Sequence, residues 1–252
     1  MEDYDGRIRF YMFNLFGLIG GVAALVWAAR TLHLYRRFRG KDSVFIITLL
    51  FIDALELLAV CALPFLYELS IMACFVLRLL SLCLHQLVAL EGVASVTHPR
   101  FAAIFSSVPC SVPLTFITFI LVGFVVVNSS FHLELQCLSF FIVTAVVPVL
   151  IQVVMCILIC TKAKPHQASG RGISEKTVLV ESLVSYLILH GPCLLVVTMY
   201  LLNPFGPPIF VWFLVGHIAA LSTMCSSISS LWVMADCLLC VMVCRLPRMQ
   251  FP

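Results

Sequence analysis

Residues 44–66 read VFIITLLFIDALELLAVCALPFL, an almost continuous run of apolar side chains. A helix needs about 20 such residues to cross the hydrocarbon core of a bilayer. The run lacks the strict alternation that marks the strands of an outer-membrane barrel. Backbone amide groups in lipid must bond within their own segment, and a helix achieves this. The stretch therefore predicts a membrane-spanning helix that carries two acidic residues, Asp53 and Glu56.

The composition of the whole chain supports the same conclusion. Hydrophobic residues make up 62% of the 252 residues, and charged residues make up 11%. Soluble domains average about 45–50% apolar and about 25% charged residues. A chain this apolar cannot cover its surface with polar groups, so the excess is expected to face lipid. The first apolar segment follows acidic residues rather than a basic region, which favours an uncleaved span over a signal peptide.

Apolar stretches divide the chain into seven expected spans. The expected fold class is therefore an all-α membrane protein, a seven-transmembrane helix bundle that forms a single domain over residues 1–252. A short amphipathic segment, 234–252, follows as a cytoplasmic tail. The spans cover about residues 10–32, 44–66, 71–96, 109–127, 137–160, 177–202 and 209–233.

The distribution of lysine and arginine predicts the orientation. In this threading, twelve cationic residues collect at the ends of spans on one side, and only Arg7 and Arg9 lie on the other. Cytoplasmic loops carry the excess of positive charge. An odd number of spans then places the N-terminus outside the cell, in a multi-pass protein of the plasma membrane. The twelve are Arg30, Arg36, Arg37, Arg39, Lys41, Arg100, Lys162, Lys164, Arg171, Lys176, Arg245 and Arg248.

Two kinds of modification site fit this topology. Asn128-Ser129-Ser130 is a glycosylation sequon and falls just after the fourth span, on the predicted outer side. Cys237, Cys240 and Cys244 lie in the expected tail beside Arg245, where S-palmitoylation is common. The alternative for these three cysteines is simple packing at the membrane surface, and the sequence favours neither.

Ionisable residues inside the spans are the candidates for function, because a charge at the bilayer centre costs about 3 kcal/mol on insertion scales. Asp53 and Glu56 share a face of the second span. Arg78 lies in the third span and is expected to pair with one of them. Such a pair is either part of a binding site or a packing lock between two helices. Buried histidines, such as His85, are expected to bond across helices rather than to hold a metal.

Motifs for catalysis, metals and cofactors are missing from the sequence. It contains neither the metalloprotease HExxH pattern nor the GxSxG pattern of hydrolases, and it has no phosphate-binding glycine loop. We therefore expect no enzyme, no cofactor, no metal site and no nucleic-acid partner. The expected partner is the lipid bilayer.

The order of several motifs resembles that of the rhodopsin-like (class A) G-protein-coupled receptors, in a divergent, orphan or chemosensory form. Residues 91–101, EGVASVTHPRF, are similar to the end of the family's third helix, where Asp/Glu-Arg-Tyr precedes x-Ala-Val-x-His-Pro. Residues 49–53, LLFID, resemble the second-helix Leu-x-x-x-Asp. Counted from the third-helix motif, Ser81 matches the serine that faces this aspartate. The resemblance therefore assigns Asp53 and Ser81 to a sodium-pocket-like pair.

Further positions match the family's activation switch. Pro148 corresponds to the fifth-helix proline, and residues 190–192, HGP, stand where the family has Trp-x-Pro. The resemblance assigns switch roles to Leu82, Pro148, Tyr186 and Pro192. The final Asn-Pro-x-x-Tyr motif is missing, and residues 229–233 are its nearest register. Cys74 and Cys137 are candidates for a substitute extracellular disulfide.

The resemblance implies a receptor that binds a small ligand from the extracellular side, at Arg78, Glu56 and His190. Its cytoplasmic coupling segment would be Glu91, Gly92 and Val93. The family has arginine where this chain has Gly92, and that arginine holds the inactive state and then contacts the G protein. Glycine can do neither, so coupling to a heterotrimeric G protein would have to be built differently. The alternatives are a non-signalling seven-span decoy, scaffold or heteromer partner, and, less favoured, a small transporter or channel.

Overall fold

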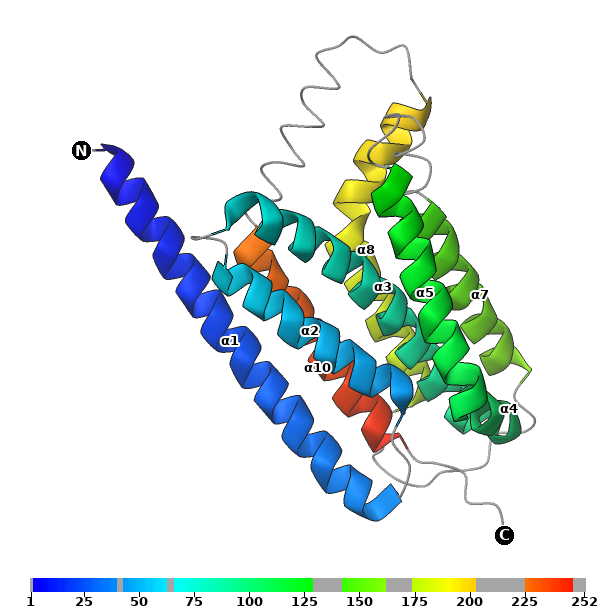
Figure 1. Cartoon of the computed structure of the whole chain (residues 1–252). Helices are drawn as coiled ribbons and strands as arrows, with labels where there is room; N and C mark the ends of the chain where they lie inside the picture. The colour runs from blue at the N-terminus through cyan, green and yellow to red at the C-terminus, as the bar shows by residue number, and fades with distance from the viewer. Residues whose placement is uncertain are drawn as a thin grey trace.

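Helix α3 (Tyr67–Thr97) lies in the middle of the molecule in the computed structural model (Figure 1). It contacts α2, α5, α7, α8 and α10, so most of its length is enclosed by other helices. Every side chain from Leu79 to Ala94 is buried. The structure describes residues 2–39, 43–62, 66–128, 142–161, 174–202 and 225–246.

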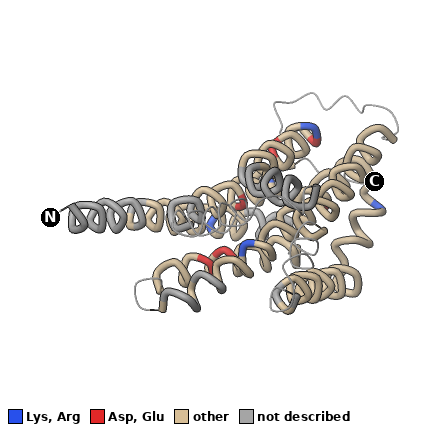
Figure 2. Tube along the Cα trace, turned by 90° about the horizontal axis from the view of Figure 1, so that it is seen from above, with Lys and Arg blue, Asp and Glu red and all other residues tan. Residues whose placement is uncertain are grey.

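The regular structure of these described residues is entirely helical, which confirms the predicted all-α class. Helix α2 flanks one side of α3, with α1 packed beyond it, and α5 and α7 flank the other side (Figure 1). Figure 2 shows how few charged residues interrupt the helices. Besides α3, the elements are α1 (Glu2–Arg39), α2 (Val44–Ala62), α4 (Pro99–Phe105), α5 (Val108–Asn128), η1 (Ile142–Val146), α7 (Val147–Cys160), α8 (Glu175–Leu202) and α10 (Cys225–Arg245).

Five of the described helical stretches are long and apolar enough to cross a membrane. They belong to the first five of the seven expected spans, and they define a multi-pass membrane protein. A count of seven goes beyond this finding. The five stretches are Gly17–Leu34, Val44–Ala62, Ala73–Thr97, Val108–Val125 and Ile142–Cys160.

The surface of α5 illustrates how these helices suit a bilayer. Phe116, Ile120 and Phe124 are exposed, whereas the hydroxyl-bearing Thr115 and Thr118 are buried. Each threonine hydroxyl donates to a carbonyl one turn back in its own helix, over 2.8 Å to Ser111 and 3.0 Å to Leu114. A helix that buries small hydroxyl residues and exposes large apolar ones fits a lipid surround, where close packing between helices favours small side chains.

The last helix differs from the sequence expectation. The seventh span was expected to end near residue 233, with a tail from 234 onward, but α10 continues without interruption to Arg245. Leu239 and Val241 lie within the core, at 0% and 3% exposure. The helix therefore continues past the expected end of the span, and the Asp236 carboxylate is hydrogen-bonded inside the bundle. The described α10 begins at Cys225, so residues 209–224 of the expected span lie outside the described residues.

Candidate functional site

Three residues on one face of α3 form hydrogen bonds or an ion pair with acidic side chains on neighbouring helices. Arg78, Ser81 and His85 are spaced three and four residues apart, which places them on the same helical face. Their partners are Glu56 and Asp53 on α2 and Asp236 on α10. We call these six residues the polar ladder.

One end of the ladder is a buried ion pair. Arg78 donates from Nη2 to Glu56 Oε1 over 2.6 Å and from Nε to the same oxygen over 3.2 Å. Glu56 is fully buried, and the Arg78 side chain is 15% exposed. The guanidinium also lies 4.9 Å from the ring centre of Trp232 on α10, a cation–π distance. Of the two partners expected for Arg78, the structure selects Glu56.

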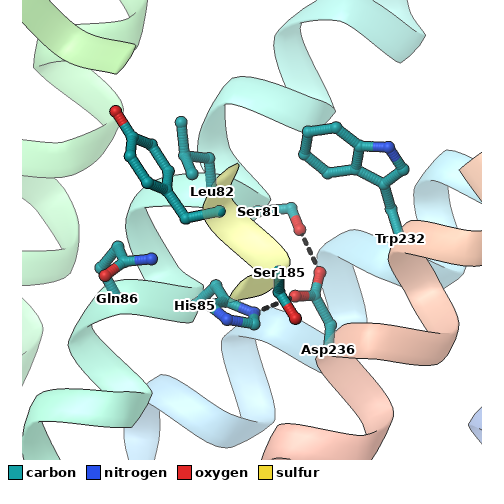
Figure 3. Close-up of a pocket in the computed structure, with 8 residues that line it drawn as sticks. Ser81, Leu82, His85, Gln86, Ser185, Trp232 and Asp236 are labelled. Carbon is teal, nitrogen blue, oxygen red and sulfur yellow. Dashed lines mark hydrogen bonds and ion pairs between the residues drawn. The ribbon is translucent and has the colours of Figure 1, made fainter. Parts of the chain in front are cut away.

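The centre of the ladder joins three helices through one hydroxyl. The Ser81 hydroxyl donates to Asp236 Oδ2, and its oxygen lies 3.4 Å from Asp53 Oδ1. Asp236 Oδ1 pairs with Nδ1 of His85 (Figure 3). All four residues are buried, with exposures of 5% or less. The predicted proximity of Asp53 and Ser81 is therefore present in the structure.

A small cavity lies beside the ladder, between α3, α8 and α10. Its volume is about 10 Å³, which is room for a single water molecule. Figure 3 shows Asp236 pointing from α10 towards Ser81 and His85 at this cavity. The lining residues are Ser81, Leu82, His85, Gln86, Ser185, Tyr186, Trp232 and Asp236.

A second polar cluster connects α3 to α7 and α8. Gln152 donates from Nε2 to Gln86 Oε1 over 2.7 Å and lies 3.1 Å from the Ser182 hydroxyl oxygen. The Ser182 hydroxyl itself donates to Gln86 Oε1 over 3.3 Å. All three residues are buried. Gln86 follows His85 directly in the sequence and lines the same cavity. The cluster therefore extends the polar contacts of α3 to α7 and α8.

Two of the expected switch residues, Tyr186 and Pro148, lie beside the π-helix η1. The Tyr186 hydroxyl donates to the Thr144 carbonyl of η1 over 2.7 Å. Pro148 is buried and follows this π-helix directly, and Leu82 lines the same cavity as Tyr186. Pro192 belongs to α8, but its side chain and that of His190 are outside the described part of the structure.

The end of α3 packs tightly under the end of α10. A Cβ atom on Gly92 would lie 2.7 Å from Val243 Cγ2 and 3.3 Å from Leu246 Cδ1. Val93 is fully buried, and Glu91 is 4% exposed and accepts a hydrogen bond from the Ser43 hydroxyl. Glu91 therefore bonds to the residue that precedes α2.

The cysteines lie elsewhere than expected from a surface tail. Cys237, Cys240 and Cys244 are 0%, 2% and 8% exposed, because α10 turns them into the bundle. Palmitoylation at these positions stays a prediction that this burial does not support. Cys74 is buried in α3, whereas Cys137 lies outside the described residues. Asn128 ends α5, and the rest of its sequon is also outside them.

Asp236 was missed in the sequence because it was assigned to the tail. An acidic residue followed by LLCVMV, residues 238–243, is itself the signature of a charge inside a span. Gln86 and Gln152, in the third and fifth expected spans, carried a similar signal. Within the described residues, no group of three or more His, Cys, Asp or Glu side chains is arranged to hold a metal ion.

No protein-family model matches the sequence. A search of the curated proteins also finds no match.

Proposed function

We propose that the chain is an atypical receptor of the rhodopsin-like kind. It crosses the plasma membrane seven times with its N-terminus outside, binds a small ligand from the extracellular side and transmits a signal. The single observation that carries this proposal is the contact of Ser81 with Asp53, 3.4 Å apart on α3 and α2. These are the two residues that the resemblance pairs, and 28 positions separate them in the chain.

The arrangement around α3 supports the same proposal. A receptor needs a central element that is connected to several helices and can shift against them. Polar contacts join α3 to α2, α7, α8 and α10, at the ladder and at Gln86. Arg78 is the least enclosed cation of the ladder, with 15% of its side chain exposed. A ligand with an anionic group would compete with Glu56 for this guanidinium.

Ligand binding is tested with purified protein in detergent. Small carboxylates and phosphate esters are screened for those that raise the melting temperature, because a ligand that binds only the folded state stabilises it. We expect hits whose stabilisation is lost in Arg78→Ala and kept in Lys176→Ala, since Lys176 is an exposed cation on α8. Compounds that stabilise Arg78→Ala as much as the wild type would show that Arg78 is not part of the binding site.

Signalling is tested separately in cell membranes. Binding of a non-hydrolysable GTP analogue to heterotrimeric G proteins is compared between membranes with and without the protein. A basal increase supports the receptor, provided that the protein reaches the surface to the same extent as a control receptor. No increase across all G-protein classes, with or without the hits from the ligand screen, would contradict signalling through G proteins.

A second candidate function is a non-signalling scaffold or heteromer partner. The packing of Val243 against Gly92 favours it, because α10 occupies the space into which a longer side chain at position 92 would extend. This candidate predicts surface expression and assembly with another membrane protein, without any G-protein response. Cross-linking in intact cells, followed by identification of the partner, tests it.

A further inference from the structure

Two neighbouring side chains of α3, His85 and Gln86, each have one nitrogen that makes no hydrogen bond to any residue that the structure describes. The two atoms are His85 Nε2 and Gln86 Nε2. His85 is 5% exposed and Gln86 is fully buried, so bulk water does not satisfy these nitrogens. A buried polar group without a hydrogen bond destabilises the fold, and such groups are rare in native proteins. Each nitrogen therefore calls for a partner.

The other polar atoms of these two side chains are already engaged. Nδ1 of His85 pairs with Asp236, and Oε1 of Gln86 accepts from Gln152 and from the Ser182 hydroxyl. An imidazole ring has only two nitrogens, and the nitrogen of a glutamine amide is a donor only. The partner must therefore satisfy two different nitrogens and must be able to accept a proton from Gln86.

Both side chains line the cavity between α3, α8 and α10. Its volume of about 10 Å³ is room for one water molecule. In the view of Figure 3, the amide nitrogen of Gln86 lies on the side of the His85 ring. An apolar molecule in this space would leave both nitrogens unsatisfied. Water both donates and accepts, so it fits either orientation of the Gln86 amide and either tautomer of the His85 ring.

The α8 side of the cavity adds a third polar contact. Ser185 lines the cavity, and its hydroxyl donates to Glu181 Oε1 over 2.9 Å. The Ser185 oxygen is therefore left as an acceptor. Gln86 Nε2, His85 Nε2 and the Ser185 oxygen together offer three partners, which is the usual number for a buried water.

We propose that this cavity is a binding site for one water molecule, held by His85 Nε2 and Gln86 Nε2. The water joins the polar ladder to the second polar cluster, which consists of Gln86, Gln152 and Ser182. One hydrogen-bonded network then runs from α10 through α3 to α7 and α8. A fully satisfied buried network fixes the helices in one arrangement, whereas a partly satisfied one is costly. The ligand is water itself, and the inference holds whether or not the protein signals.

The test detects the water by solid-state NMR of the full chain in lipid bilayers, with ¹⁵N-labelled histidine and glutamine. Magnetisation is transferred from water protons to the side-chain nitrogens, and short transfer times report water in direct contact. Gln152 is the internal control, because its amide nitrogen is bonded to Gln86 and lies 3.1 Å from the Ser182 oxygen, and it is not among the residues that line the cavity. We expect faster transfer to His85 and Gln86 than to Gln152. Equally slow transfer to all three would show that the cavity is dry and would overturn the proposal.

Two substitutions at one position locate the water. Ser185→Leu extends a side chain into the cavity, whereas Ser185→Ala removes the same hydroxyl without filling the space. Leucine and alanine have similar helix propensities, so the backbone is affected alike. We expect Ser185→Ala to keep the fast transfer to Gln86 and Ser185→Leu to lose it. Fast transfer in both variants would place the water outside this cavity and overturn the site.

Melting temperatures of the same two variants in detergent test what the water does for the fold. Ser185→Leu is expected to melt below Ser185→Ala, because filling the cavity leaves the nitrogens of His85 and Gln86 buried without a partner. A higher melting temperature for Ser185→Leu, with the transfer lost, would show that the network does not depend on the water and would overturn its linking role. Should Ser185→Leu fail to fold, the comparison of Gln86 with Gln152 in the wild type still decides whether the water is bound.

Discussion

The Ser81 hydroxyl on α3 donates a hydrogen bond to the Asp236 carboxylate on α10, 155 residues further along the chain. Through this bond the last described helix is fixed to the central one. The carboxylate is buried and is also paired with His85, so α10 cannot slide along α3 without breaking both contacts. The ladder thus sets the register of α10 in the bundle.

Removing the carboxylate of Asp236 is expected to destabilise the fold strongly. Asp236→Leu leaves His85 buried and deprives Ser81 of its acceptor. Breaking a buried pair by removing one partner costs about 3–5 kcal/mol. Melting in detergent, followed by size-exclusion chromatography, measures the effect. The control is Met234→Leu, an exposed position on the same helix that is expected to be neutral. A wild-type melting temperature for Asp236→Leu would contradict the ladder.

Gly92 and Gly123 are matched glycines with opposite surroundings. A Cβ at position 92 would lie 2.7 Å from Val243 Cγ2, whereas one at position 123 would meet nothing within 4 Å. Alanine is better than glycine in a helix by about 1 kcal/mol. We expect Gly123→Ala to be neutral or stabilising, and Gly92→Ala to lower the melting temperature. Adding Val243→Ala should restore part of the loss, and a destabilising Gly123→Ala would show that the difference does not come from packing.

The ion pair of Arg78 and Glu56 predicts a characteristic double-mutant result. Arg78→Met leaves the fully buried Glu56 without its cation and is expected to cost about 3–5 kcal/mol. Replacing both residues, as Arg78→Met with Glu56→Leu, is expected to recover most of this loss, because no buried charge remains. The four melting temperatures form a cycle that isolates the pairwise term. Additive losses would show that the two side chains do not interact.

The charge asymmetry predicts a topology that can be measured directly. An epitope tag before Met1 is expected to bind antibody on intact cells, and a tag after Pro252 only on permeabilised cells. The positive-inside rule is the physical reason, because twelve cationic residues lie on one predicted side and two on the other. Surface staining of the C-terminal tag on intact cells would indicate an even number of spans or the reverse orientation.

The sequence predicted those parts of the fold that depend on local composition. Apolar runs indicated the helices, and the spacing of Asp53 and Glu56 placed both on one face of α2. The ion pair of Arg78 with Glu56 was one of two expected pairings, and the choice between them depends on how α2 and α3 cross. No local pattern contains that angle.

Asp236 shows where such reasoning fails. The seventh span was expected to end at residue 233, three residues before Asp236, although the cost of burying this carboxylate is offset by Ser81 and His85 from a distant helix. The burial of Cys237 and Cys240 was missed for the same reason, because both residues were assigned to the tail. In the sequence, Gly92 was interpreted as the loss of the arginine that the family has at this position. The structure shows that its small size permits the close approach of α10.

The close approach of Gly92 and Val243 is expected to couple the substitutions that these two positions tolerate. A longer side chain at position 92 has no room until the residue at position 243 becomes smaller or the end of α10 moves away. The order of substitutions is therefore constrained: the change at 243 must come first or at the same time. Among relatives of this chain, an arginine or lysine at position 92 is expected to occur together with glycine, alanine or serine at position 243.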